Sequence, residues 1–205
     1  MYRSDMYAFD TGDCEWREMG MPDPSKYELS PGQRVHVRMT VANRFLVMFG
    51  GSTPSSECTD DLYVIDTKIK PWEWIRMPAP KDDDASPAPK PRFGHSICSY
   101  GTYVVIFGGL GENSIYLNDM WVIDTKDWEG DEGFSWQYVN PGGSYWPKGR
   151  DSHSMCAVRN TLVLFGGYDG VSPKVSELKH MHVRPVHDSQ VRLIPWRVWR
   201  NRGQQ

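Results

Sequence analysis

Three arginines that recur at equal spacing are the first candidates for chemistry. The interval along the chain from Arg34 to Arg92 equals that from Arg92 to Arg150. A guanidinium binds a carboxylate or a phosphate through two parallel hydrogen bonds, so each arginine could hold an anionic ligand. We favour a structural role, in which each arginine forms an ion pair between neighbouring units of the chain. The expected acidic partners are Asp61, Asp119 and Glu177.

The histidines offer acid–base or metal chemistry. His95 and His153 are separated by the same interval as the arginines, so we expect them to form stabilising hydrogen bonds rather than to catalyse. Alternate residues of a strand point to one face, so His180 and His182 could chelate a metal together with His187. This pattern lacks a spaced fourth ligand, and a degraded sequence repeat explains it better. We therefore expect no metal and no cofactor.

Other classes of protein are excluded by motif, charge and composition. The sequence has no Gly-rich phosphate loop, no nucleophile elbow and no zinc-protease helix, so no catalytic residue is assigned and no enzyme is expected. A net charge of −3 argues against a nucleic-acid partner. No signal peptide is recognisable, and the apolar runs are far shorter than the roughly 20 residues that span a bilayer, so no membrane contact is expected.

The cysteines indicate a reducing compartment. Cys14, Cys58, Cys98 and Cys156 include no close pair and therefore no disulfide framework. The cytoplasm is the expected location, with the nucleus as an alternative. Cys98 and Cys156 are separated by the same interval as the arginines, and both are expected to be small buried side chains.

A sequence repeat orders the chain and would position these groups. Each arginine precedes a double glycine at a constant distance, and an apolar run leads into each glycine pair. The second half of each unit recurs at residues 61–66 and 119–124, in degraded form at 177–182, and once more at 5–10 near the start. The double glycines are Gly50-Gly51, Gly108-Gly109 and Gly166-Gly167.

Each repeat is expected to form four strands, named a to d in chain order. The apolar runs are continuous rather than alternating, which indicates strands buried on both faces. The glycine pairs permit positive φ and close approach of neighbouring backbone. Strand a is expected to begin near residues 35, 94 and 152, and strand b is expected to cover 44–49, 102–107 and 161–165. Strand c is expected to cover 61–66, 119–124 and 177–182, and strand d is expected to surround Trp74, Trp136 and Trp196.

These motifs resemble the kelch repeat, in which Arg-x-x-His is followed by an apolar strand, Gly-Gly, Asn-Asp-Leu-Tyr/Trp and Trp. The resemblance covers nearly the whole chain and implies an all-β, kelch-type β-propeller of four-stranded antiparallel blades. The first unit departs from it at Val37 and the third at Lys179 and His182. The middle unit matches at Arg92, His95, Gly108, Gly109, Asn118, Asp119, Met120, Trp121 and Trp136.

The repeat count predicts an incomplete ring. The sequence holds three and a half units, whereas propellers close with about four to eight blades. The chain is expected to be a fragment or, less simply, a half-propeller that self-associates so that a second copy completes the ring. The predicted partial propeller covers residues 1–205, with a half blade at 1–19, blades at 34–77 and 92–139, and a degraded blade at 150–199.

The resemblance implies that a protein or peptide partner binds to one end of the blades. Strands alternate in direction, so the b–c and d–a loops emerge at the same end, and loops on a rigid scaffold are the usual place for recognition. The expected function is that of a binding scaffold or adaptor. The alternatives are a propeller enzyme or metal-dependent protein related to kelch-like oxidases or isomerases, and an architectural segment of a larger protein. The candidate binding residues are Ser55, Ser56, Glu57, Glu112, Asn113, Tyr116, Tyr168, Asp169 and Val171.

Overall fold

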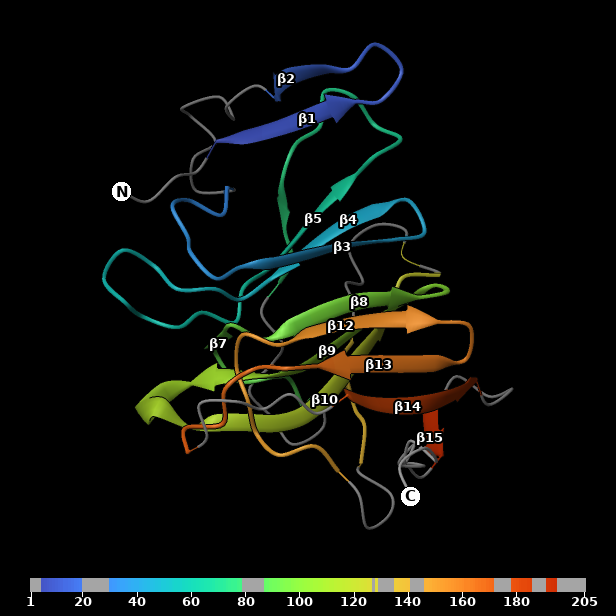
Figure 1. The fold of residues 1–205 in the computed structure, drawn as a ribbon. Helices are drawn as coiled ribbons and strands as arrows, with labels where there is room; N and C mark the ends of the chain where they lie inside the picture. Colours follow the sequence, from blue (N-terminus) through green and yellow to red (C-terminus); the bar gives the residue numbers. More distant parts are fainter. Residues whose placement is uncertain are drawn as a thin grey trace.

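The computed structural model describes residues 5–19, 30–78, 87–126, 128, 135–140 and 146–171, together with the backbone of two further strands at 178–185 and 191–194. These residues form β-strands joined by loops, with one short 3-10 segment, η2 (Glu112–Ser114). None of the described helical residues forms a helix long and apolar enough to cross a membrane. The described part of the chain is therefore all-β, as predicted (Figure 1).

The strands pair antiparallel into four sheets, each of consecutive strands. The half-blade consists of β1 (Met6–Asp10) and β2 (Glu15–Met19). Blade 1 consists of β3 (Arg38–Ala42), β4 (Phe45–Phe49), β5 (Leu62–Asp66) and β6 (Ile75–Arg76). Blade 2 consists of β7 (Arg92–Phe93), β8 (Ser96–Tyr100), β9 (Tyr103–Gly111), β10 (Tyr116–Asp124) and β11 (Gln137–Tyr138), and both β7 and β8 pair with β9. Blade 3 consists of β12 (Ser154–Val158), β13 (Thr161–Phe165), β14 (Leu178–Pro185) and β15 (Val191–Ile194).

The blades lie next to one another in the order of the sequence. Strands β3, β8 and β12 are the first long strands of blades 1 to 3, and they run alongside one another through the middle of the molecule (Figure 1). The sheets form part of a propeller and do not close into a ring (Figure 1). The predicted kelch-type incomplete ring is confirmed. The predicted domain limits stay a prediction.

Apolar layers between consecutive blades form the core. The layer between blades 1 and 2 contains Phe49 and Ile106, and the layer between blades 2 and 3 contains Phe107 and Leu164. Ile106 and Phe107 are neighbours on β9, and successive strand residues point to opposite faces. The continuous apolar runs therefore fill both layers, as predicted, and each fully buried side chain of this size contributes about 1.5–3 kcal/mol.

The double glycines lie where neighbouring backbones come closest. All six have positive φ, as predicted, between +61° and +102°. A Cβ atom on Gly50 would lie 2.6 Å from the Arg92 carbonyl oxygen of the next blade. A Cβ atom on Gly109 would lie 2.8 Å from the Phe93 carbonyl oxygen of its own blade. In the first two repeats, the next blade therefore confines the first glycine of the pair and the glycine's own blade confines the second. A residue with a side chain does not fit at either position without a shift of the backbone.

The outer face of blade 3 is uncovered. Phe165 and Cys156 occupy the repeat positions that Phe107 and Cys98 hold in blade 2. Phe107 is fully buried beneath blade 3, whereas Phe165 is 55% exposed. Cys98 is buried and Cys156 is exposed, so the prediction that both cysteines are buried is wrong for Cys156. The reason is that no further blade of the structure packs on this face.

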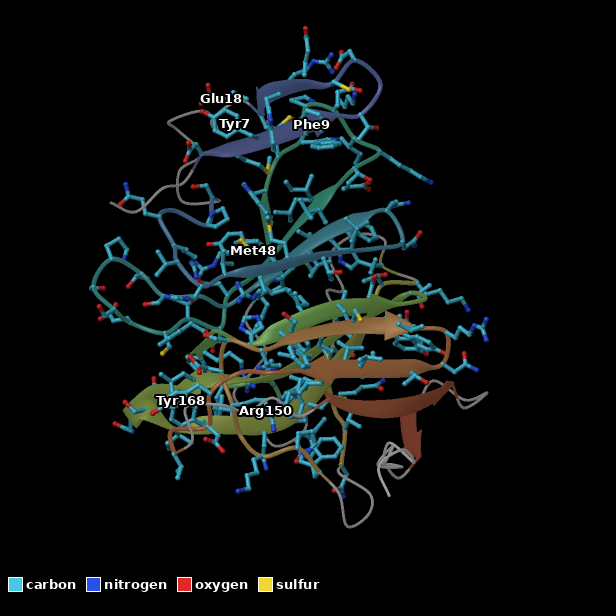
Figure 2. The ribbon with its side chains drawn as sticks, viewed as in Figure 1. Tyr7, Phe9, Glu18, Met48, Arg150 and Tyr168 are labelled. Carbon is cyan, nitrogen blue, oxygen red and sulfur yellow. The ribbon has the colours of Figure 1, made fainter. Side chains whose placement is uncertain are left out.

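The half-blade carries a second uncovered face, of different composition. Tyr7 and Phe9 are exposed on β1 (Figure 2). Trp16 is also exposed, and its ring lies 5.2 Å from that of Phe9 between centroids. In blade 2 the corresponding strand positions are held by Trp121 and Ile123, which are buried against blade 1. The two uncovered faces are therefore the front and the back of a blade, not two copies of one surface.

Candidate functional site

A buried arginine holds the loop end of blade 2. Arg92 is fully buried, and its guanidinium donates to both carboxylate oxygens of Asp119 at 2.6 and 2.7 Å. It also donates to the carbonyls of Gly108 at 3.0 Å and Lys90 at 2.9 Å. Burial would raise the pKa of Asp119, but the hydrogen bonds and charge of Arg92 outweigh it and lower that pKa. These internal contacts occupy the guanidinium, so it does not serve as a receptor for an external anion.

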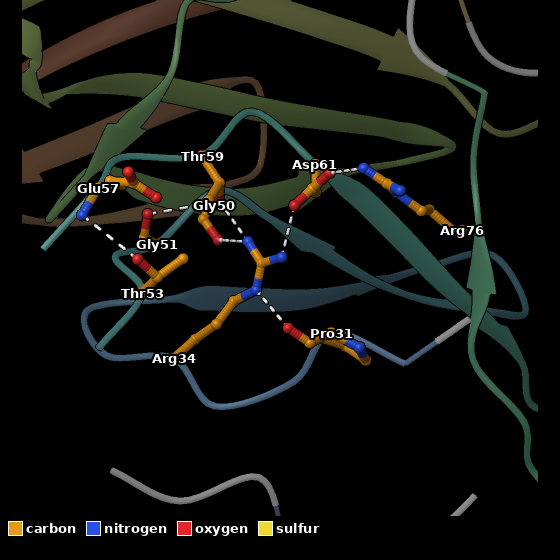
Figure 3. A network of polar contacts seen from close by, with 9 residues as sticks. All are labelled: Pro31, Arg34, Gly50, Gly51, Thr53, Glu57, Thr59, Asp61 and Arg76. Carbon is orange, nitrogen blue, oxygen red and sulfur yellow. Dashed lines mark hydrogen bonds and ion pairs between the residues drawn. The ribbon is translucent and has the colours of Figure 1, made fainter. Parts of the chain in front are cut away.

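The equivalent arginine of blade 1 forms a similar network. Arg34 donates to Asp61, to Thr59 and to the Gly50 carbonyl, as Figure 3 shows. Asp61 also pairs with Arg76 from β6. Burial would raise the pKa of Asp61, but hydrogen bonds from both arginines outweigh it and lower that pKa. In blade 3, the guanidinium of Arg150 likewise donates to the carbonyl of Gly166, at 2.9 Å.

Asp61 and Asp119 are the acidic partners of Arg34 and Arg92, as predicted, but each pair lies within one blade rather than between neighbouring units. The predicted pair of Arg150 with Glu177 lies outside the described residues. The backbone of the arginines makes the connection instead. The Gly51 N–H donates to the Arg92 carbonyl at 3.0 Å, and the Gly109 N–H donates to the Arg150 carbonyl at 2.8 Å. Arg92 and Arg150 therefore each bind their own blade through the side chain and the preceding blade through the main chain.

The repeated histidines lie in the interfaces between neighbouring blades, which we call the blade seams. His153 Nε2 is 2.7 Å from the Ser96 hydroxyl of blade 2, a hydrogen bond between blades. His95 is buried, its ring contacts Phe49 of blade 1, and neither ring nitrogen has a hydrogen-bond partner among the described residues. Burial, followed by the charge of the nearby arginine, lowers the pKa of His95 to about 3 and that of His153 to about 4. Both rings are therefore neutral near pH 7.

The loop between β4 and β5 is a compact turn. The Ser55 hydroxyl lies 2.8 Å from the Thr53 hydroxyl and donates to the Glu57 carboxylate at 3.1 Å, and the Glu57 N–H donates to the Thr53 hydroxyl at 3.3 Å. Ser56 has a φ of +67°, which a non-glycine residue rarely adopts. Ser55, Ser56 and Glu57 are exposed, but their polar contacts with described residues stay inside the turn, mostly with Thr53.

The loop between β9 and β10 differs from the predicted one. Both strands are longer than expected, because pairing continues to Tyr116 and Leu110 past a register shift between Leu117 and Met120. The tip that remains is η2, where Asn113 has a φ of +55°. Glu112 and Asn113 are exposed at this tip. They lie on a strand extension of blade 2 rather than on a long flexible loop.

The structure brings together two predicted residues from different loops. The rings of Tyr116 and Tyr168 meet edge to face, with 5.6 Å between centroids and an interplanar angle of 87°. Figure 2 shows Tyr168 at the loop end of the blades, beside the tip of β9 and β10. Asp169 accepts a hydrogen bond from the Val171 N–H at 3.1 Å, and the Val171 side chain is 89% exposed. Tyr116, Tyr168, Asp169 and Val171 therefore form one surface, which we call the tyrosine surface.

Asp151 belongs to the tyrosine surface and was not predicted. Its backbone pairs with that of Tyr168 through two hydrogen bonds of 3.0 Å. Its Oδ1 atom is buried and accepts no hydrogen bond from the described residues. A signal was present in the sequence, because Asp151 occupies the column where blades 1 and 2 have the apolar residues Val35 and Phe93.

The predicted alternative of a metal site falls outside the described part of the chain. His187 and Glu177 are not described, and neither are the side chains of His180 and His182, whose backbone lies in β14. Among the described residues, no three His, Cys, Asp or Glu side chains are grouped to hold a metal ion. The described surface that gathers candidate residues from two blades is the tyrosine surface.

The sequence has clear relatives. It matches the family model described as the KLHDC2/KLHL20/DRC7 Kelch-repeats domain over residues 1–183. It is 29% identical over 170 residues to an F-box/kelch-repeat protein of Arabidopsis thaliana, covering 79% of this chain and 33% of that protein. It is 27% identical over 180 residues to host cell factor 1 of Homo sapiens, covering 81% of this chain and 8% of that protein. The chain thus spans about a third or less of these relatives.

A solved structure of YjhT has the same fold. The TM-score is 0.64 at 14% sequence identity, and the match covers 94% of this chain and 52% of that one. At this identity the likeness concerns the fold alone. Since one family model accounts for residues 1–183, from the half-blade into blade 3, the chain belongs to the kelch-repeat family.

Proposed function

We propose that the chain is a protein-binding scaffold or adaptor module, and that its partner binds the tyrosine surface at the loop end of blades 2 and 3. The observation that carries this proposal is the contact between Tyr116 and Tyr168, which joins side chains from two blades. Tyr168 is exposed and Tyr116 is half-buried. Tyrosines at a surface supply large contact area at low cost in conformational entropy, and they are enriched in protein interfaces. Val171 extends the same surface with an exposed apolar side chain.

The rigidity of the supporting blades favours binding. The Asp151 and Tyr168 backbones are paired, and Arg150 anchors the same segment to Gly109 and Gly166. A preformed surface loses little conformational entropy when a partner docks. The names of the relatives, an F-box/kelch-repeat protein and host cell factor, also support interaction with other proteins. The cytoplasm or nucleus is the proposed location.

Binding is favoured over catalysis by the placement of the titratable groups. His95 and His153 lie in the blade seams and are neutral near pH 7, so neither is presented to a substrate at the loop end. The arginines are engaged by carboxylates or carbonyls of their own blades. The tyrosine surface offers shape, apolar area and negative charge, which are features of recognition.

Site-directed photocrosslinking tests this function. A benzoylphenylalanine in place of Val171 should crosslink a partner from cells, and the same probe in place of Lys126, in an exposed turn after β10, should not. Tyr116→Ala with Tyr168→Ala should reduce the Val171 crosslink at least about tenfold, since contact residues at the centre of an interface often contribute 1.4 kcal/mol or more. Equal crosslinking from both positions, or no effect of the double change in a folded chain, would contradict the proposal.

A further inference from the structure

The seam between blades 2 and 3 combines aromatic rings with negative charge. Tyr116 lies against Tyr168 and also against Gly170, where a Cβ atom would be 2.7 Å from the Tyr116 ring. Burial, then the charge of Asp151, the neighbouring Tyr168 and the charge of Asp169 raise the pKa of Tyr116. Both carboxylates are therefore near enough to act on this phenol. The seam can attract a cation and offers it an aromatic surface.

One oxygen of Asp151 lacks a donor. Oδ2 accepts a hydrogen bond from the Ser152 hydroxyl at 3.2 Å, while the buried Oδ1 accepts none from the described residues. An ionised carboxylate oxygen that is buried without a donor costs free energy. A ligand with N–H groups at this position would remove that cost.

The corresponding seam between blades 1 and 2 has different chemistry. The backbone hydrogen bonds that connect the blades are the same in both seams, from Gly51 to Arg92 and from Gly109 to Arg150. The fold therefore does not require tyrosines or a carboxylate at these positions. The residues that correspond to Tyr116, Tyr168 and Asp151 in the preceding repeat are Cys58, Leu110 and Phe93.

The loops at this end of the blades are acidic on balance. Residues 52–60, 110–118 and 168–176 include four acidic side chains and one basic side chain, Lys174. Lys148 is a competing cation close to the tyrosine surface, because it precedes Gly149 on the segment next to Tyr116, and it is exposed. The net negative charge of these loops thus favours a positively charged partner segment.

We propose that the seam between blades 2 and 3 binds an arginine or lysine side chain of the protein partner. The cation lies against the rings of Tyr116 and Tyr168 and donates to the carboxylates of Asp151 and Asp169. Cations bind favourably to tyrosine faces, and charge-assisted hydrogen bonds to carboxylates are the strong ones. This inference rests on the proposed function and adds the chemical class of the side chain that the surface recognises.

Selection from a random peptide library on the 205-residue chain provides the probe. The selected peptides should share an arginine or lysine at one position. In fluorescence polarisation, Asp151→Asn should weaken the best peptide about tenfold, Asp151→Glu should retain most of the affinity, and Lys148→Met should strengthen it. Asp60→Asn removes one loop charge from blade 1 and should change affinity less than about twofold, since an exposed and distant charge contributes little.

A double-mutant cycle separates direct contact from general charge effects. A peptide with a neutral isostere, citrulline for arginine or norleucine for lysine, should bind about tenfold more weakly to the native chain. It should show no further loss with Asp151→Asn. Equal losses with Asp60→Asn and Asp151→Asn would overturn the inference, because the effect would then come from net charge.

Two other results have separate meanings. Peptides without a basic residue that still require Tyr116 and Tyr168 would overturn the cation inference and leave the proposed binding surface intact. Peptides that bind a folded chain regardless of every loop substitution, or a library that yields no binder, would overturn the proposed function and this inference with it. Circular dichroism of each variant shows that the fold is retained.

Discussion

The side chain and the main chain of Arg92 act on different blades. Its guanidinium pairs with Asp119 inside blade 2, while its carbonyl accepts a hydrogen bond from Gly51 of blade 1. The side-chain pair is largely removed from water, since Arg92 is fully buried and the Asp119 side chain is 20% exposed. Removing one partner from such a pair leaves the other charge without compensation.

Arg92→Met should therefore lower the free energy of unfolding by about 3–5 kcal/mol, as for other buried pairs that lose one partner. Urea denaturation followed by tryptophan fluorescence measures this change. The matched control is Arg17→Met, because Arg17 pairs with Asp10 but both side chains are about half exposed, at 52% and 43%. The control should lose less than about 1 kcal/mol. Equal losses in the two variants would show that the buried pair is not a special source of stability.

At the scale of strands and turns, the repeat predicts most of the structure. The apolar runs identified β4, β9 and β13, and the glycine pairs identified the backbone with positive φ. The longer β9 and β10 were not predicted, because the glycine and polar residues at 111–114 have the composition of a loop. Tyr116 and Tyr168 were both predicted as binding residues, but their contact with each other was not predicted. Spacing along the chain does not show which side chains meet across a blade seam.

A comparison of Gly101 with Gly108 separates the cost of a left-handed backbone conformation from the cost of steric contact with an added side chain. Gly101 and Gly108 have nearly equal φ, +60° and +61°. A Cβ atom on Gly101 would meet nothing within 4 Å, whereas on Gly108 it would lie 2.9 Å from the Arg150 carbonyl oxygen and 3.0 Å from that of Leu117. The first is in a hairpin turn and the second is in the seam between blades.

Gly101→Ala should cost about 1–2 kcal/mol, the cost of a left-handed conformation for a residue with a side chain. Gly108→Ala should cost about 1–3 kcal/mol more, because the added methyl forces the blades apart. Thermal unfolding of the two variants measures the difference. Equal destabilisation would mean that blade packing yields at Gly108 and that the close approach does not need glycine.

On the scale of the whole molecule, the two uncovered faces are the surfaces through which we expect the chain to associate. Blade 3 exposes Phe165 on its outer face, and the half-blade exposes Tyr7, Phe9 and Trp16. The half-blade of each copy consists of strands c and d. A second copy would therefore supply the same two strands again, and not the strands a and b that would complete the blade. The structure therefore gives no support to a ring of seven complete blades made from two copies.

Contact between these unlike faces should instead be weak, and it should add further copies of the chain without closing a ring. The mass of the 205-residue chain, measured by light scattering, should rise with concentration, because exposed apolar sheet faces favour association. Phe165→Asp should shift this rise to at least about fivefold higher concentration. Ile69→Asp, which removes an exposed apolar residue from a turn, should not. A constant monomer mass, or the same shift in both variants, would show that the outer face of blade 3 does not mediate association.

The common backbone frame of the two blade seams has a consequence for how such proteins diversify. The hydrogen bonds from Gly51 to Arg92 and from Gly109 to Arg150 hold the seams alike, although one is lined by Cys58 and Leu110 and the other by tyrosines. A gene that encodes this frame can accumulate substitutions at one seam without disturbing the next. Natural selection can therefore adjust each seam to a separate ligand, so that a single scaffold acquires several specificities through point mutations alone.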